Sequence, residues 1–385
     1  MTRKILVVTG SRAEFGLLKP LLYKIKKDPD LILQIIATGM HLSKKYGLTV
    51  NEIHEAGFET DLEIDLMLED DSDESIAKSI AIGMTHFMSA YKSLSPDLII
   101  ILGDRFEILP VAISALIGKV PVAHIHGGEK TEAAYDEAIR HSITKMSHIH
   151  FAANEEYRKR IIQLGESPET VFNVGGLGVD AIKEIKLLTK EELEKSLKLK
   201  FLDKNLIITF HPVTLNQTGS EDEVKELLSA LKDLKETSLI FTMPNADSGN
   251  AKIFDLIEGF VYKNNNAYAF KSLGQLRYFS CMSLVDGVVG NSSSGLLEAP
   301  TFKIGTINIG DRQKGRLQAG SVLNCTAKKN KILESLSFMY SEKFQSKLKN
   351  VKNPYGDGGA SIEIVNTLKE IKLEGIIKKT FYDLV

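Results

Sequence analysis

The sequence predicts an α/β fold built from two Rossmann-like domains, and three observations support this prediction. The chain has 385 residues, which exceeds the roughly 250–300 that one hydrophobic core supports. Short apolar runs rich in β-branched residues alternate with longer helical patterns, as in parallel sheets that are buried on both faces. This succession starts at Lys4 and starts again near Asn205, so each half is expected to form its own sheet.

The first half opens with a predicted strand, Lys4–Val8, and a predicted helix, Phe15–Ile25. The turn between them carries Arg12, and its backbone N–H groups could hold an anion. An N-cap serine beside a surface arginine explains the same residues equally well. The second strand, Leu31–Thr38, is followed by His41, which lies just past the strand end.

Two further strands of the first half, Leu98–Leu102 and Val120–Ile125, end in polar residues. The side chains that follow them are Asp104, Arg105 and Glu107 after the first strand, and His126 and Glu129 after the second. The next helix, Tyr135–Met146, carries a third group on one side of its first turns, namely Asp136, Glu137, Arg140 and His141. Helix capping explains one such acid, but three acid-bearing groups at strand ends or helix starts predict a catalytic cleft.

The pairs His124/His126 and His148/His150 raise the question of a metal site. Alternate residues of a strand point to one face, and imidazole is a common zinc ligand. However, no third ligand stands at close spacing, and two adjacent parallel strands explain the repeated pattern. We therefore expect no metal, and we expect His148 and His150 to be core or boundary residues.

The second half repeats the pattern of the first, because its strand Leu206–Phe210 ends in His211. A later strand, Gly287–Gly290, runs into hydroxyl donors and a glycine that would suit a diphosphate at a helix start: Ser292, Ser293, Ser294 and Gly295. Glu298 is expected one turn inside that helix, where it could accept hydrogen bonds from ribose hydroxyls. An elaborate N-cap is the alternative explanation. Cations follow the next strand, at Arg312 and Arg316.

The domain boundary is placed at a glycine cluster, 175–178, which is interpreted as a hinge. A polar helix, Lys190–Lys198, follows it with Thr189 as the expected N-cap. The expected domains are 1–176 and 177–365, and a C-terminal helix, 366–385, is expected to pack back on the first domain.

Composition narrows the classes of partner and location. The formal net charge of -2 argues against nucleic acid or an anionic membrane surface as the main partner. No apolar run approaches the ~18 residues of a membrane span. Only two cysteines occur, and the apolar run after Lys4 is too short for a secretion signal, so a cytoplasmic protein is expected.

Eight motifs, in a fixed order, make the sequence resemble one known family. They are GSRAEFG, GMHLS, ILGDRFE, HIHGGE, YDEAIRHSITKMSH, FHP, MPNADSG and GNSSSGLLE. Together they resemble the hydrolysing UDP-N-acetylglucosamine 2-epimerases of bacterial sialic-acid and legionaminic-acid synthesis; the epimerase half of the animal bifunctional epimerase/kinase is also similar. The resemblance covers nearly the whole chain. It implies a glycosyltransferase-B type of fold, in which two Rossmann-like domains face each other across a cleft that holds the active site.

The resemblance also implies roles for the residues at matching positions. The residues implied to hold UDP are Arg12, Arg105, His211, Asn245, Ser292, Ser293, Glu298 and Arg312. Those implied to surround the sugar are Asp104, Glu129, Asp136 and Glu137, with His41 and Arg140. One departure is His126, because relatives such as the animal enzyme have a glutamate directly before the double glycine. Either the imidazole or Glu129 is then expected to take that acid/base role.

The implied reaction releases UDP and a free 2-epimeric, mannose-type sugar, by elimination to a 2-acetamidoglycal and hydration. It needs two protonatable groups on opposite faces of carbon 2, and the candidates are Asp104, His126, Glu129, Asp136 and Glu137. Arginines can stabilise the departing diphosphate, so no metal and no cofactor is expected. The substrate is UDP-N-acetylglucosamine or its 2,4-diacetamido-6-deoxy analogue, and the family resemblance suggests a homodimer.

Three alternatives stay open. A non-hydrolysing 2-epimerase shares the fold, but such enzymes resemble HGDTTT where this chain has GDRFE. A retaining glycosyltransferase often has two glutamates eight positions apart, whereas Glu298 has Thr306 at that place. A sugar-nucleotide sensor without turnover would need the phosphate site but not the cluster of acids.

Overall fold

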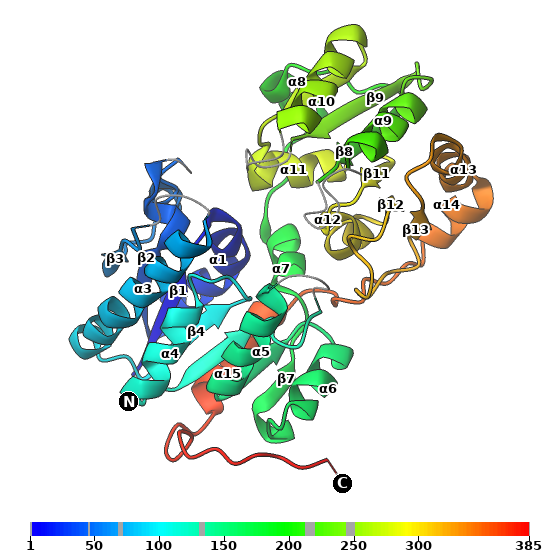
Figure 1. The fold of residues 1–385 in the computed structure, drawn as a ribbon. Coiled ribbons are helices and arrows are strands. Elements are labelled where there is room, and N and C mark those ends of the chain that lie inside the picture. Colours follow the sequence, from blue (N-terminus) through cyan, green and yellow to red (C-terminus); the bar gives the residue numbers. More distant parts are fainter. Residues whose placement is uncertain are drawn as a thin grey trace. The chain divides into compact units, whose positions relative to one another are not determined.

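The computed structural model describes residues 2–44, 47–67, 72–130, 135–211, 220–243 and 251–384. The chain forms two compact units: unit 1 is Met1–Ala181 with Gly358–Val385, and unit 2 is Ile182–Asp357. Each unit has a parallel sheet, and helices connect successive strands except between β12 and β13, so the predicted α/β class with two Rossmann-like sheets is confirmed (Figure 1).

In the described part of unit 1, seven parallel strands form one sheet in the order β3-β2-β1-β4-β5-β6-β7. Their bounds are β1 Arg3–Thr9, β2 Leu31–Thr38, β3 Leu62–Ile64, β4 Leu98–Leu102, β5 Val122–Ile125, β6 Ile149–Ala152 and β7 Val171–Asn173. The strand order reverses between β1 and β4, and ligands of open α/β sheets bind at such a switch point. The loops that follow β1 and β4 are therefore the first place to look for a site.

The helices of unit 1 cover both faces of this sheet (Figure 1). Their bounds are α1 Arg12–Lys27, η1 Gly39–Leu42, α2 Val50–Glu55, α3 Asp73–Leu94, α4 Leu109–Gly118, α5 Asp136–Met146, α6 Glu155–Gln163, η3 Pro168–Thr170, α7 Leu177–Glu184 and α15 Ala360–Glu370. Alternate residues of β1 serve opposite cores, as the period of a strand requires. Val7 packs in the core that α1 and α15 cover, and Val8 packs in the core that α3 and α4 cover.

The C-terminal part of the chain returns to unit 1 through α15, which packs beside α1. Asp180 accepts hydrogen bonds from the backbone N–H groups of Gly359 at 2.6 Å and Ser361 at 2.7 Å, and its negative charge suits the start of a helix. This helix ends at Glu370, and no helix follows it in the described residues up to 384. The expectation of a helix over 366–385 is therefore wrong in its bounds.

In the described part of unit 2, six parallel strands follow the order β10-β9-β8-β11-β12-β13. The strands are β8 Lys204–Thr209, β9 Thr237–Thr242, β10 Ala267–Phe270, β11 Gly287–Gly290, β12 Gly305–Ile309 and β13 Val322–Cys325. The helices are α8 Lys190–Leu197, α9 Ser220–Leu231, α10 Ala251–Lys263, α11 Gly274–Met282, α12 Ser294–Leu297, η4 Ala299–Phe302, α13 Lys329–Met339 and α14 Glu342–Leu348. Thr189 caps α8 in a reciprocal capping box with Glu192, which confirms the predicted N-cap. Across all the described ranges, the helices are too short or too polar to cross a membrane.

Candidate active site

Arg140 on α5 contacts polar groups from three segments of unit 1. Its guanidinium forms an ion pair with Asp104, which follows β4, and lies 3.4 Å from a carboxylate oxygen of Glu137. It also donates a hydrogen bond to the backbone carbonyl of Glu129 at 2.9 Å. The Arg140 side chain is only 4% exposed, whereas that of Asp104 is 23% exposed. A buried cation thus fixes an acid that solvent or a ligand can still reach.

His126 and Glu129 form a second contact in this cluster. The backbone of His126 has a φ of 64°, so the residue leaves the strand in the left-handed region and does not share a strand face with His124. Its Nδ1 lies 3.5 Å from Glu129 Oε1, and its Nε2 accepts a hydrogen bond from the backbone of Leu177 at 3.4 Å. Burial lowers the pKa of His126 to about 4, so the ring is neutral at pH 7. Its Nδ1–H is then directed at the carboxylate of Glu129.

Asp136 and Glu137 begin α5, and each faces a different partner. Glu137 Oε1 lies 3.2 Å from His141 Nε2, one turn further along the same helix. Burial raises the pKa of Asp136, while the charge of Arg105 opposes that shift. The structure therefore brings the carboxylates of Asp104 and Glu137 and the backbone carbonyl of Glu129 together around Arg140. It also places Asp136 within the electrostatic influence of Arg105.

Arg105 lies between two acids in the turn after β4. Glu107 is fully buried and binds the guanidinium through both oxygens, at 2.8 and 3.1 Å. Glu14 Oε1, on α1, lies 4.0 Å from Arg105 Nε. The Arg105 side chain is 39% exposed, so part of the guanidinium can still meet a ligand.

Side chains in and near the turn after β1 contact the local backbone and one another. The Ser11 side chain accepts a hydrogen bond from the backbone of Glu14, which confirms the N-cap interpretation, and the Glu14 carboxylate accepts one from Gly10 at 2.7 Å. Arg12 is half exposed and lies 3.9 Å from Glu52. His41 is fully buried, and its ring nitrogens lie 3.1 Å from Thr9 Oγ1 and 2.9 Å from Thr49 Oγ1. In this structure His41 therefore braces the loop through neighbouring side chains.

In unit 2, the serine segment after β11 leads into a helix shorter than expected. The segment comprises Ser292, Ser293, Ser294 and Gly295, and α12 ends at Leu297. Glu298 is therefore the C-cap of α12, and the expectation that it lies one turn inside a helix is wrong. Pro300 explains this end, because proline has no N–H to donate and its ring clashes with a preceding helical turn. The hydroxyl groups are therefore more important for any anion here than the dipole of so short a helix.

A chain of hydrogen bonds joins Glu298 to Tyr278 through a serine. Ser294 Oγ donates to Glu298 Oε2 at 2.5 Å and lies 2.6 Å from the Tyr278 hydroxyl. Burial raises the pKa of Glu298 to about 7, and the bond from Ser294 opposes this. The sequence motifs did not include Tyr278, because α11 precedes the serine segment and only tertiary packing brings its side chain near.

Asn291 connects two other predicted residues of unit 2. Its side chain exchanges hydrogen bonds with the backbone of His211, at 2.7 and 2.8 Å, and its backbone carbonyl accepts one from Arg312 at 3.1 Å. Burial, helped by the charge of Arg312, lowers the pKa of the His211 ring to about 4. Asn291 was within a predicted motif but was not singled out. Asn245 lies outside the described residues.

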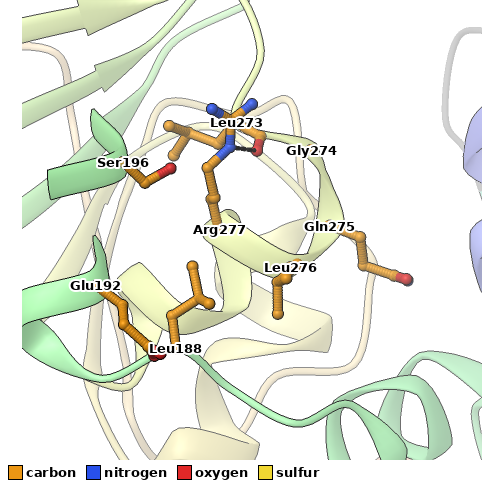
Figure 2. A pocket seen from close by; sticks show the side chains of 8 residues that line it. All are labelled: Leu188, Glu192, Ser196, Leu273, Gly274, Gln275, Leu276 and Arg277. Carbon is orange, nitrogen blue, oxygen red and sulfur yellow. Dashed lines mark hydrogen bonds between the residues drawn. The ribbon is translucent and has the colours of Figure 1, made fainter. Parts of the chain in front are cut away.

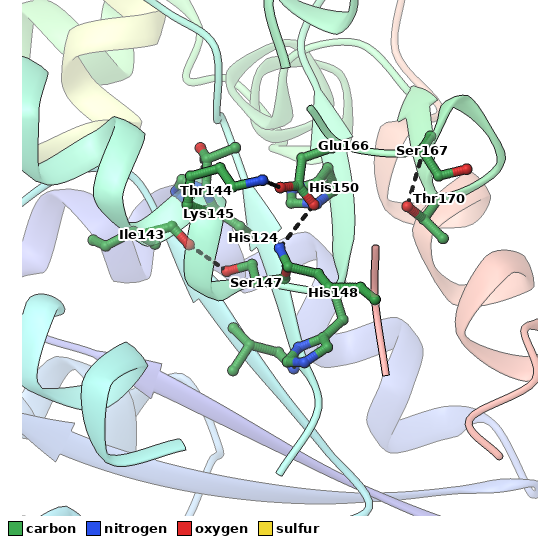
Figure 3. Close-up of polar contacts among 12 residues, drawn as sticks. His124, Ile143, Thr144, Lys145, Ser147, His148, His150, Glu166, Ser167 and Thr170 are labelled. Carbon is green, nitrogen blue, oxygen red and sulfur yellow. Dashed lines mark hydrogen bonds and ion pairs between the residues drawn. The ribbon is translucent and has the colours of Figure 1, made fainter. Parts of the chain in front are cut away.

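His124, His148 and His150 lie in a region of buried polar contacts beside α5 (Figure 3). His150 Nε2 lies 3.0 Å from Glu166 Oε2, and His148 Nδ1 accepts a hydrogen bond from the backbone of Val122 at 3.2 Å. Both His124 nitrogens have partners, Gly103 O and Thr144 Oγ1. In the part of the chain that the structure describes, no group of three or more His, Cys, Asp or Glu residues could hold a metal ion.

An open pocket of about 540 Å³ lies elsewhere on unit 2, between α8 and the start of α11 (Figure 2). Residues that line it include Glu192 and Ser196 on one side and Leu273 and Arg277 on the other. The Arg277 Nε atom donates to the backbone carbonyl of Leu273 at 2.7 Å. None of the residues predicted for the site lines this pocket.

Comparison with known proteins shows which family this chain resembles over its length. The family model described as UDP-N-acetylglucosamine 2-epimerase matches residues 23–369. A protein of Campylobacter jejuni named GDP/UDP-N,N'-diacetylbacillosamine 2-epimerase (hydrolyzing) is 44% identical over 385 residues, covering 99% of each chain. Polysialic acid biosynthesis protein P7 of Escherichia coli is 41% identical, covering 99% of this chain and 98% of its own.

The fold is also similar to that of solved structures. The crystal structure of a putative UDP-N-acetylglucosamine 2-epimerase from Listeria monocytogenes superposes with a TM-score of 0.82 and 18% identity, and the match covers 100% of both chains. The eight motifs, the two Rossmann-like sheets and the whole-length relatives agree. The chain belongs to the UDP-N-acetylglucosamine 2-epimerase family of enzymes.

Proposed function

We propose that this protein is a hydrolysing 2-epimerase, which converts a UDP-linked 2-acetamido sugar into UDP and the free 2-epimeric, mannose-type sugar. The observation that carries the proposal is the cluster at the buried Arg140, where the guanidinium contacts the carboxylates of Asp104 and Glu137. The backbone carbonyl of Glu129 binds the same guanidinium. A binding protein without turnover would have no need to hold several acids beside a partly exposed carboxylate. The names of the relatives support the same reaction class.

The chemistry requires the bond to UDP to weaken first, since no carbonyl acidifies the proton on carbon 2. Positive charge and hydroxyl donors at the diphosphate supply this stabilisation. In our proposal Ser292, Ser293 and Arg312 of unit 2 hold the diphosphate, together with Arg12 and Arg105 of unit 1. Glu298 accepts from the ribose hydroxyls, and the bond from Ser294 orients its carboxylate.

Proton removal and return at carbon 2 then need two different groups. Asp104, in an ion pair with Arg140, is suited to be the base that gives the 2-acetamidoglycal. Asp136 has a raised pKa, which suits a residue that donates a proton during hydration. His126, Glu129 and Glu137 complete the acid/base set, with His126 directed at Glu129.

The test is incubation with UDP-N-acetylglucosamine, UDP-N,N'-diacetylbacillosamine and the GDP form of the latter, in deuterated water, followed by proton NMR. We expect free nucleoside diphosphate, a free 2-epimeric sugar and deuterium at carbon 2. An epimerised sugar still linked to the nucleotide would point to a non-hydrolysing enzyme, and transfer only to an added acceptor would point to a glycosyltransferase. A retained proton at carbon 2 would rule out the elimination.

We further propose that the product enters nonulosonic acid synthesis, of the sialic or legionaminic type, and that the protein works as a homodimer. The pathway is supported by the relative named for polysialic acid biosynthesis. A coupled assay with a condensing enzyme that joins a mannose-type sugar to pyruvate tests the pathway, because only the correct epimer is consumed. Sedimentation equilibrium tests the dimer, and a monomer at micromolar concentration would contradict it.

A further inference from the structure

Two acidic side chains from different elements approach Arg105. Glu107 belongs to the same turn as Arg105 and holds its guanidinium through two hydrogen bonds, whereas Glu14 comes from the first turn of α1. The Glu14 Oε1 atom lies 4.0 Å from Arg105 Nε. One cation therefore lies close to two carboxyl groups.

The backbone leaves room for both carboxyl groups. A Cβ atom on Gly10 would lie 3.3 Å from Glu107 Cβ and 3.4 Å from Glu14 Oε2. Gly39 has a φ of 56°, and a Cβ there would lie 2.8 Å from Glu107 Cγ. Glycine at these two positions of unit 1 thus leaves the space that the side chains of Glu14 and Glu107 occupy.

The two acids are satisfied to different degrees. Both Glu107 oxygens accept from Arg105, and Glu14 Oε2 accepts from the backbone N–H of Gly10 at 2.7 Å. Glu14 Oε1 is buried and has no hydrogen-bond partner among the described residues. A buried carboxylate oxygen without a hydrogen-bond partner destabilises the ionised form of Glu14. Protonation of Glu14 also removes the repulsion between two negative charges beside one positive charge.

The direction in which the pKa of Glu14 is shifted agrees with this geometry. Burial raises the pKa of Glu14 to about 7, and the charge of Glu107 adds to the rise, against the hydrogen bond from Gly10 and the charge of Arg105. The other titratable groups near the cluster are His41, whose pKa burial lowers to about 4, and Asp136 and Tyr135, which act on it from the start of α5. None of them adds a positive charge at pH 7.

We propose that Glu14 is a positioning residue that sets the charge beside Arg105 by holding or releasing one proton, and that its protonated form favours binding of a nucleoside diphosphate. With Glu14 protonated, the cluster of Glu14, Arg105 and Glu107 has a net charge of zero. With Glu14 ionised, the net charge is negative and repels the diphosphate. The ligand in this inference rests on the proposed function, but the proton on Glu14 does not.

The test is calorimetric titration of UDP from pH 6 to 8.5 into the native protein, Glu14→Gln and Glu55→Gln. The amide of the first variant mimics the protonated acid, and Glu55 is an exposed acid on α2 that serves as a matched control. Between pH 6 and 8.5, we expect the UDP dissociation constant of the native protein to increase by a factor about ten times larger than that of Glu14→Gln. A difference of this size is what one additional negative charge near the diphosphate implies. Glu55→Gln should follow the native protein, and the titration of UDP itself is common to all three.

A second measurement needs neither a ligand nor a variant. The amide proton of Gly10 is hydrogen-bonded to Glu14, so its NMR shift in the native protein should titrate near pH 7. Equal pH dependence of UDP binding in the native protein and Glu14→Gln, or a Gly10 shift that titrates near pH 4.5, would overturn the inference. Absence of UDP binding at every pH would instead count against the proposed function, and the Gly10 titration would still decide the charge of Glu14.

Discussion

His124 Nε2 lies 2.7 Å from the backbone carbonyl oxygen of Gly103, the residue directly before Asp104. The other ring nitrogen, Nδ1, lies 3.2 Å from Thr144 Oγ1 on α5. Burial lowers the pKa of His124 to about 3, so the ring is neutral and its one proton belongs on Nε2, facing the carbonyl. Since Arg140 is also on α5, the ring links the strand end that carries Asp104 to the helix that carries its partner.

Replacement of His124 by phenylalanine should therefore cost stability and activity together. A phenyl ring still fills this fully buried position, but it cannot donate to the Gly103 carbonyl, which loses its side-chain partner. The Thr144 hydroxyl still donates to the backbone carbonyl of Arg140 at 3.0 Å. We expect the free energy of unfolding to fall by about 1–3 kcal/mol, the usual cost of such an unpaired group. Urea unfolding measures it, with His54→Asn as the control, because His54 is exposed. Equal losses in the two variants would contradict the role given to His124.

Local signals made the fold predictable. The strands that precede Asp104 and His126 are apolar runs bounded by glycine or proline. Thr189 stands three residues before a glutamate, as in a capping box. Each of these signals lies within a few consecutive residues of the sequence. The convergence of acids was predictable because carboxyl ends of parallel strands meet at one edge. The choice of Asp104 as the partner of Arg140 was not, since side-chain pairing depends on how α5 packs.

Other parts of the site depend on tertiary contacts that no local pattern shows. The bond between Tyr278 and Ser294 needs α11 to pack beside the serine segment. The burial of His41 depends on Phe15 and Thr49, which come from different elements. The early end of α12 is the exception, because Pro300 is present in the sequence and could have indicated it.

Substitutions at Asp104 and Glu298 should affect different steps. Asp104→Asn keeps the shape of the side chain and removes the base, so turnover should fall by about 10²–10⁴-fold. UDP affinity should stay close to that of the native protein. Glu298→Ala should instead weaken UDP binding by about 1–3 kcal/mol, because the ribose hydroxyls lose their acceptor. Calorimetric titration of UDP and turnover rates, measured on both variants, test this division.

Asp104→Asn also leaves the buried Arg140 with less negative charge around it, so its fold needs a control. Urea unfolding of the variant at the assay temperature shows whether the lost turnover reflects unfolded protein. A folded Asp104→Asn variant that turns over normally, or that binds UDP as poorly as Glu298→Ala, would contradict the assignment of Asp104 to the chemical step.

Activity should survive removal of divalent metal ions. The proposed diphosphate contacts are arginines and hydroxyl groups, which can stabilise the leaving group directly. Turnover in EDTA should stay within a factor of about two of the untreated rate, a barrier difference well under about 1 kcal/mol. Complete loss of turnover, restored by a divalent ion, would contradict this and would reopen the question of His124 and His126 as ligands.

Glu166 should make stability depend on pH in the acid range. Its side chain is 3% exposed and lies 2.5 Å from Lys145 Nζ, 2.8 Å from Lys379 Nζ and 3.0 Å from His150 Nε2 (Figure 3). Although burial acts in the opposite direction, these bonds lower its pKa from 4.5 to about 2. An acid whose folded-state pKa is lowered contributes stability that is complete above its unfolded value and is lost as pH falls toward its folded value.

The substitution Glu166→Gln should therefore reduce the free energy of unfolding by about 3 kcal/mol at pH 7 and by only about 1 kcal/mol near pH 3. Urea unfolding at intervals between these pH values measures the difference from the native protein. Glu169→Gln is the matched control, since Glu169 is a nearby exposed acid, and its difference should stay within about 0.5 kcal/mol throughout. A Glu166→Gln deficit that is the same at pH 3 and pH 7 would show that lost packing, and not the carboxylate charge, accounts for the change.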